Sequence, residues 1–123
     1  MFCGKTPIDG EYAETRELIE KLWFLVCPGT EAGLDDPRLN PMAEGAPSLQ
    51  KLGCRKLLVS SAEKDISLAR AAAYYQAVVA SGWPGMVEWL ESKGEEHVFF
   101  LDKPDCDESV ALMDMVVTFL ASD

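Results

Sequence analysis

Two side chains in the second half of the chain, Asp65 and His97, are of types that can transfer a proton to and from a reacting group. Asp65 ends the stretch AEKD, and His97, the single histidine of the 123 residues, lies within GEEHVFF. A carboxylate beside an imidazole fixes the tautomer of the ring and stabilises the imidazolium that forms when the ring takes a proton. The pair can act as a general base only if the fold brings the two side chains together.

The elements around these residues predict that the fold does so. The apolar run RKLLVSSA at residues 55–62 predicts a buried parallel strand, and MVEWLES at residues 86–92 predicts a second one. LARAAAYYQAVVASG between them predicts a helix over residues 68–82 that stops at Gly82. This is a β-α-β unit with a right-handed crossover. Because the carboxyl ends of parallel strands meet at one edge of a sheet, we expect Asp65 and His97 to be neighbours.

The rest of the chain predicts further helices and a long irregular segment. Residues 8–26 are expected to open with a turn at Asp9–Gly10 and to continue as a helix, and a last helix is expected over residues 110–120. Residues 33–53 are rich in turn formers, with a short helix at residues 47–52. The stripes expected to face the core are Leu18, Ile19, Leu22, Trp23 and Val26, then Leu68, Ala72, Tyr75 and Val79, then Val110, Met113, Val117 and Leu120.

Each candidate residue also has a plain structural explanation. An Asp after a strand is commonly the cap of the next helix, and a lone histidine in a loop is commonly a surface or hydrogen-bonded structural residue. Spacing alone leaves these alternatives open. Trp23 and Phe24 are likewise packing residues or, as an alternative, part of a substrate pocket.

Composition and charge exclude several classes of function. The chain is long enough for one domain, and its net charge of −10 and pI near 4.5 disfavour nucleic acid and anionic membrane surfaces as partners. No C-x-x-C pair occurs and there is one histidine, so we expect neither a metal site nor a cofactor. No apolar leader follows Met1, and the longest apolar run, residues 22–27, is too short for a bilayer span. We expect a cytoplasmic protein with reduced thiols at Cys3, Cys27, Cys54 and Cys106.

Several stretches resemble a known family. GLDDPRLNPMAEGAPSLQKLGCRKLLVSSAEKD and AAYYQAVVASGWPGMVEWLESKGEEHVFFL, with GKTPI and LWFLVCPGT before them, resemble plant carboxylesterases of the α/β-hydrolase fold-3 group, relatives of the gibberellin receptor. The resemblance implies that Asp65 is the triad acid and His97 the triad histidine. In the family, charged residues often follow the acid, and of these this chain retains only Arg70. Phe100 stands where the family often has a histidine.

The resemblance also implies an architecture. Residues 1–123 look like the C-terminal segment of an α/β-hydrolase fold-3 domain, an α/β fold truncated to its last two parallel strands. Residues 1–53 correspond to a cap-side helix and a turn-rich loop, and residues 54–123 to a β-α-β-α unit that carries the acid and the histidine. The strand at residues 55–62 would then have a free edge, which predicts a homodimer, complementation by another fragment, or marginal stability.

The family's nucleophile motif is absent from the 123 residues. Neither G-x-S-x-G nor an HGG oxyanion stretch occurs, and Ser60 and Ser61 lie inside a strand without flanking glycines. The resemblance therefore implies a carboxylic ester hydrolase segment that is inactive alone and acts on a small ester substrate when completed. The alternatives are a non-catalytic small-molecule binding protein like the gibberellin receptor, or an interaction fragment. The receptor looks to have lost the triad histidine, so His97 favours the esterase lineage.

Overall fold

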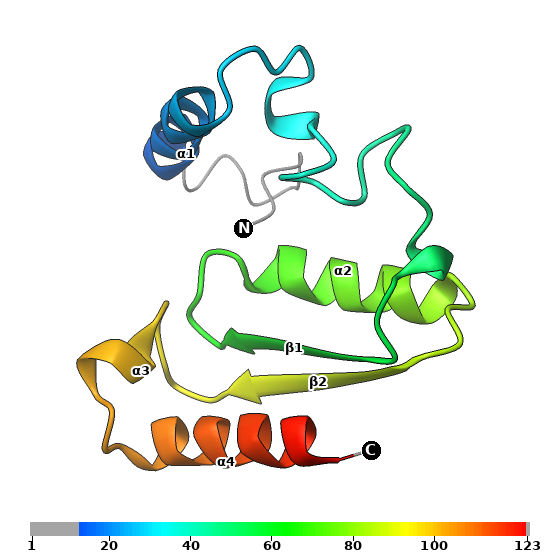
Figure 1. Cartoon of the computed structure of the whole chain (residues 1–123). Coiled ribbons are helices and arrows are strands. Elements are labelled where there is room, and N and C mark those ends of the chain that lie inside the picture. Colours follow the sequence, from blue (N-terminus) through cyan, green and yellow to red (C-terminus); the bar gives the residue numbers. More distant parts are fainter. Residues whose placement is uncertain (1–12, 123) are drawn as a thin grey trace.

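Two parallel strands, β1 (Lys56–Ala62) and β2 (Met86–Ser92), form the centre of the computed structural model, which describes residues 13–122. Lys56 pairs with Met86 at one end of the sheet, and Ala62 pairs with Ser92 at the other. Helix α2 (Leu68–Ala80) connects the strands and lies over one face of the sheet, while α4 (Asp107–Ala121) lies over the other (Figure 1). The predicted β-α-β unit and C-terminal helix are confirmed, and each strand is within one residue of its predicted bounds.

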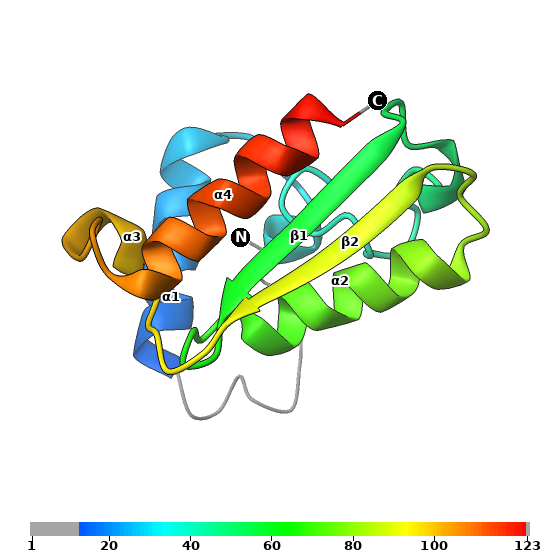
Figure 2. The ribbon, with the colours of Figure 1, turned by 90° about the horizontal axis from the view of Figure 1, so that it is seen from below.

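Packing on the two faces of the sheet is uneven. Between the sheet and α4, Ala62, Phe99 and Leu112 form a buried cluster, and each has less than a tenth of its surface exposed. On the α2 side, Val78 is the most deeply buried side chain, and the ring of Tyr75 packs against Trp89 of β2 at 5.7 Å between centroids. Figure 2 shows that β2 lies on one side of β1, and in the described residues nothing pairs with the other edge of β1.

The inward faces of two helices differ from those predicted. In α4 the predicted inner residues are 49–71% exposed, and the helix turns Ser109, Leu112 and Val116 toward the sheet instead. The exposed set is Val110, Met113, Val117 and Leu120. In α2 the prediction fails only at Val79, which is 53% exposed while its neighbour Val78 is buried; Leu68, Ala72 and Tyr75 are half-buried as predicted. Apolar residues occupy more than one stripe of each helix, so periodicity alone does not select the stripe that meets the sheet.

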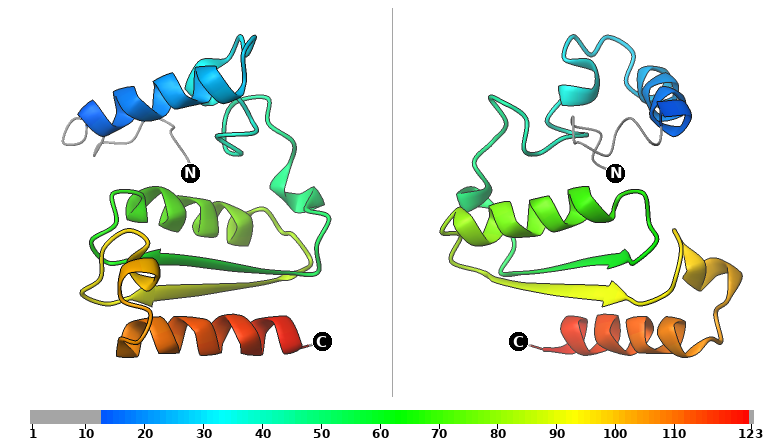
Figure 3. Two further views of the ribbon diagram at one scale, coloured as in Figure 1. Left: turned by 60° about the vertical axis from the view of Figure 1, so that its left-hand side comes forward. Right: turned by 180° about the vertical axis from the view of Figure 1, so that it is seen from behind.

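The N-terminal part forms a helix and a loop that packs on it. Helix α1 (Ala13–Val26) confirms the later part of the predicted helix, and residues 8–12 of that prediction lie outside the described residues. Two short 3-10 helices follow, Gly33–Asp35 and Leu49–Lys51. The second replaces the short helix predicted at residues 47–52. Figure 3 shows α1 and this loop on the α2 side of the sheet.

Within α1 the predicted stripe is only partly covered. Ile19 and Trp23 are half-buried, whereas the other members of the stripe are at least 50% exposed. Those exposed members are Leu18, Leu22 and Val26.

A buried aspartate organises the loop that follows α1. The carboxylate of Asp36 accepts hydrogen bonds from the backbone and guanidinium of Arg38 and from the hydroxyl of Thr30. The Arg38 guanidinium in particular holds the pKa of Asp36 far below its usual range. The same guanidinium lies 5.6 Å from the ring centre of Trp23, so the loop is docked on α1 through a cation–π contact.

The entry into β2 is fixed by Trp83. Its ring is 8% exposed, and its Nε1 donates to the carbonyl of Leu52 at 3.2 Å. Gly85 passes so close to this ring that a Cβ there would lie 2.2 Å from a ring carbon. At the same end of the sheet the ammonium of Lys56 donates to the carbonyls of Phe119 and Ser122, which ties the start of β1 to the end of α4.

Cys27, Cys54 and Cys106 are free thiols, and Cys3 lies outside the described residues. No helix between residues 13 and 122 has the length and hydropathy needed to span a bilayer.

Candidate active site

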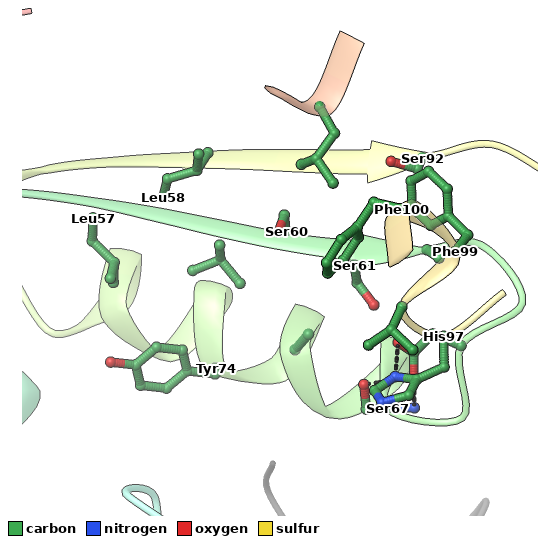
Figure 4. A pocket seen from close by; sticks show the side chains of 16 residues that line it. Leu57, Leu58, Ser60, Ser61, Ser67, Tyr74, Ser92, His97, Phe99 and Phe100 are labelled. Atoms are coloured by element: carbon green, nitrogen blue, oxygen red, sulfur yellow. Dashed lines mark hydrogen bonds and ion pairs between the residues drawn. The ribbon is translucent and has the colours of Figure 1, made fainter. Parts of the chain in front are cut away.

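Asp65 and His97 lie side by side at the carboxyl end of the two strands. Nδ1 of His97 is 2.7 Å from Oδ2 of Asp65. Figure 4 shows the ring of His97 beside Ser67. The side chain of Asp65 is 9% exposed, and that of His97 is 50% exposed. Because Nδ1 is engaged by the carboxylate, Nε2 is the nitrogen left to exchange a proton with a reacting group. The structure thus brings together the two residues that the sequence singled out.

Ser67 holds the other oxygen of the same carboxylate. Its backbone N–H and its hydroxyl each donate to Oδ1 of Asp65 at 2.7 Å. Burial raises the pKa of Asp65, but the hydrogen bonds from His97 and from Ser67 together outweigh burial, so the pKa is lowered. Asp65 therefore remains ionised at neutral pH. The bond to the Ser67 N–H forms a turn just before α2, whose cap residue is Ser67 and not Asp65, so the carboxylate also has a local structural role.

Backbone hydrogen bonds join the loop that carries Asp65 to the loop that carries His97. The N–H of Glu63 donates to the carbonyl of Ser92, and the N–H of Lys64 donates to the carbonyl of Glu95, both at 2.9 Å. The N–H of Gly94 donates to the Glu63 carboxylate at 2.7 Å. Sequence reasoning did not find these contacts because no residue pattern marks which loops face each other.

The backbone turns sharply directly after His97. Val98 has φ 51° and ψ 26°, and no other non-glycine residue between 13 and 122 has a positive φ. A β-branched residue in this left-handed conformation is a steric outlier. The stretch GEEHVFF, predicted to be entirely loop, contains the start of a short helix, α3 (Phe99–Asp102). Phe99 belongs to the buried cluster with Ala62 and Leu112.

A groove with a volume of about 450 Å³ begins at the Asp65–His97 pair and follows β1. Its walls include Leu57 and Val59 of β1, Tyr74 of α2 and Leu112 of α4. Burial raises the pKa of Tyr74, so its phenol stays neutral at neutral pH. Trp23 and Phe24 are not among the residues that line this groove, which gives no support to their alternative role in a substrate pocket.

Serine side chains line the groove without forming a nucleophile. Ser60 and Ser61 lie inside β1 toward its carboxyl end, and the hydroxyl of Ser61 is buried without a hydrogen-bond partner. Among residues 13–122, the His97 ring is hydrogen-bonded to Asp65 and to no serine. In the same residues no three His, Cys, Asp or Glu side chains converge as metal ligands do. The site holds an imidazole that is oriented by a carboxylate.

Comparison with known proteins gives consistent matches. A family model described as alpha/beta hydrolase fold matches residues 4–101. The chain is 40% identical over 121 residues to a probable carboxylesterase 2 of Arabidopsis thaliana, with 97% of this chain and 38% of that protein covered. It is 44% identical over 122 residues to a tuliposide A-converting enzyme b2, amyloplastic, of Tulipa gesneriana; the match covers 99% of this chain and 32% of that enzyme. A 2-hydroxyisoflavanone dehydratase of Glycyrrhiza echinata is 40% identical over 122 residues; the match covers 98% of this chain and 37% of the dehydratase. The chain spans about a third of the length of these relatives.

Proposed function

The chain belongs to the alpha/beta hydrolase fold family, and on that premise we propose that it supplies the acid and the general base of a carboxylic ester hydrolase. The observation that carries the proposal is the 2.7 Å contact between Nδ1 of His97 and Oδ2 of Asp65. In ester hydrolysis the base removes the proton of a serine hydroxyl as its oxygen adds to the ester carbonyl. The base then returns the proton to the leaving alcohol. In a second step it takes a proton from the water that displaces the acyl group from the serine, and the serine oxygen regains a proton. Asp65 keeps the ring in the required tautomer and stabilises its protonated form.

The nucleophile and the oxyanion donors come from outside these 123 residues. Ser60 and Ser61 are strand residues, whereas a serine nucleophile needs a strained turn that exposes its oxygen beside backbone donors. The 123 residues contain no G-x-S-x-G sequence, and the relatives extend well beyond the part that this chain matches. We therefore expect negligible ester turnover by the chain alone.

The completing segment lies along the free edge of β1. This edge presents unpaired backbone N–H and C=O groups, and the groove beside it ends at the Asp65–His97 pair. An extended segment that pairs with β1 would continue the sheet and bring its own carboxyl end next to His97. The apolar walls of the groove would then be covered, and a small ester would bind at the His97 end.

A chimeric enzyme tests the proposal. The 123 residues are joined to the preceding two thirds of the Arabidopsis relative, and the product is assayed with p-nitrophenyl acetate. We expect turnover in the chimera and none in the isolated chain. His97→Ala should reduce kcat by roughly 10³-fold or more because no other group can take the serine proton.

Asp65→Asn should also lower kcat strongly in the chimera, because an amide favours the wrong tautomer of the ring. Ser60→Ala is the matched control, since it removes a hydroxyl from the groove without touching the pair. A folded chimera with no turnover, or ester turnover by the isolated chain that His97→Ala abolishes, would contradict the proposal.

A second candidate activity follows from the relative named as a dehydratase. Loss of water from a substrate also requires a base. His97 with Asp65 would remove a proton from carbon as the C–O bond of the neighbouring hydroxyl breaks, and would return that proton to the departing oxygen to give water. The same chimera discriminates the two when it is given 2-hydroxyisoflavanone and the loss of water is followed by mass spectrometry. Turnover of this substrate without turnover of the ester would favour the dehydratase.

A further inference from the structure

His97 sits between two fixed points of the backbone. On its N-terminal side, Glu95 is tied to the Asp65 loop through the hydrogen bond from Lys64 N–H, and its carboxylate pairs with Lys103 at 2.7 Å. On its C-terminal side, Phe99 is 4% exposed in the cluster with Ala62 and Leu112. Glu96, His97 and Val98 bridge the two points, and the Phe99 N–H donates to the carbonyl of Glu96 at 3.4 Å, which closes the turn between them.

The bridge is held in a conformation that valine disfavours. The isopropyl group of Val98 is 38% exposed and lines the groove, so side-chain burial alone gives little reason for φ 51°. The hydrogen bond from Leu101 N–H to the carbonyl of Val98, at 2.9 Å, fixes this residue to the first turn of α3. If Phe99 left the cluster, a valine would relax to a negative φ and the chain direction between His97 and α3 would change.

We propose that Phe99 is a positioning residue for His97 and acts through the left-handed backbone of Val98. Burial of the Phe99 ring maintains the strained turn, and the turn directs the imidazole to Asp65. The inference rests on the proposed function only in that such positioning serves catalysis if His97 is the base. The coupling itself is a property of the fold and can be measured without substrate.

The single histidine makes the coupling directly measurable. In the 15N-labelled chain, long-range 1H–15N correlation spectra report which ring nitrogen carries the proton. The spectra are recorded at the alkaline end of a pH series, where the tautomer of the neutral ring is set by its hydrogen bonds. In the wild-type chain the Asp65 carboxylate accepts from Nδ1–H, so this tautomer should be the major form.

Four variants separate positioning from general stability. Phe99→Ala, and Phe99→Leu as the version that keeps part of the buried volume, should make the Nδ1–H tautomer the minor form. Leu112→Ala is the matched control, because it removes a side chain of the same cluster that belongs to α4 and leaves the Phe99 ring in place, so it should lower the melting temperature without changing the tautomer. Val98→Gly should keep the tautomer and raise the melting temperature, since glycine adopts a positive φ without strain.

The double variant Val98→Gly/Phe99→Leu is the decisive measurement. With glycine at position 98 no strain drives the turn away from its native angles, so the Nδ1–H tautomer should recover relative to Phe99→Leu alone. No recovery, an unchanged tautomer in both Phe99 variants, or an equal loss in Leu112→Ala would overturn the positioning proposal. If the wild-type chain shows the Nε2–H form, the Asp65–His97 contact is absent in solution and the proposed function fails with it.

Discussion

At the scale of the residue, the site depends on the Asp65 carboxylate, which binds the His97 ring and Ser67 at the same time. Asp65 accepts hydrogen bonds from the ring of His97 and from both donors of Ser67. The sequence predicted Asp65 and His97 because both follow predicted strands and only one histidine exists. It could not predict the role of the Ser67 hydroxyl, because a serine two residues after an aspartate is a common helix start. The left-handed Val98 also had no sequence signal, since valine is the wrong residue type for that conformation.

Ser67→Ala should make the chain more sensitive to acid. The pKa of Asp65 is lower in the fold than the value of about 3.9 in an unfolded chain, so its ionised form stabilises the fold above that value. This contribution is lost as the pH falls through the folded pKa. Removal of the Ser67 hydroxyl raises the folded pKa, so acid unfolding should begin at higher pH. At neutral pH we expect a loss of about 1–2 kcal/mol in the free energy of unfolding.

Urea unfolding at a series of pH values between neutrality and acid measures this effect. Ser60→Ala is the control, because Ser60 is an exposed strand residue of the same groove. Identical pH dependence in Ser67→Ala and in the wild-type chain would show that the hydroxyl does not support the carboxylate.

At the scale of the element, the type and order of helices and strands were predicted better than their buried faces. Both strands were found within one residue because short apolar runs between turn formers have few other interpretations. The inner face of α4 was wrong because its apolar residues at spacings of three and four mark a stripe that the sheet does not cover. Helix periodicity shows that a face is apolar, and tertiary contacts decide what that face meets.

Gly85→Ala tests the packing that starts β2. A methyl group at this position would overlap the Trp83 ring, which is itself held by a hydrogen bond to Leu52. We expect a loss of about 1–3 kcal/mol in the free energy of unfolding, the usual cost of overpacking. Gly53→Ala is the matched control, because a Cβ there meets no atom within 4 Å. Thermal unfolding followed by tryptophan fluorescence compares them, and equal melting temperatures would contradict the close approach.

At the scale of the whole molecule, the described chain leaves apolar surface and strand edge uncovered. One edge of β1 has no partner, and large hydrophobic side chains are exposed on α1 and α4. A two-stranded sheet is marginal by itself, and unpaired edges favour association between chains. The net charge of −10 opposes that association by mutual repulsion, more so at low salt.

We therefore predict self-association that grows with protein and salt concentration and uses the β1 edge. Ser60→Lys should shift the equilibrium toward monomer, because a lysine on an edge strand disfavours pairing with another chain. Gln76→Lys adds the same charge on the exposed side of α2 and should leave the equilibrium unchanged. Sedimentation equilibrium over a range of concentrations measures this. A wild-type chain that stays monomeric throughout and melts cooperatively would refute the prediction.

The hydrogen bonds between the Glu63–Asp65 and Ser92–His97 loops couple the opening of one loop to that of the other. These contacts help to hold Asp65 beside His97. Local opening of either loop would break hydrogen bonds that both loops share. The amide protons of Glu63, Lys64 and Gly94 should therefore exchange with solvent at similar rates.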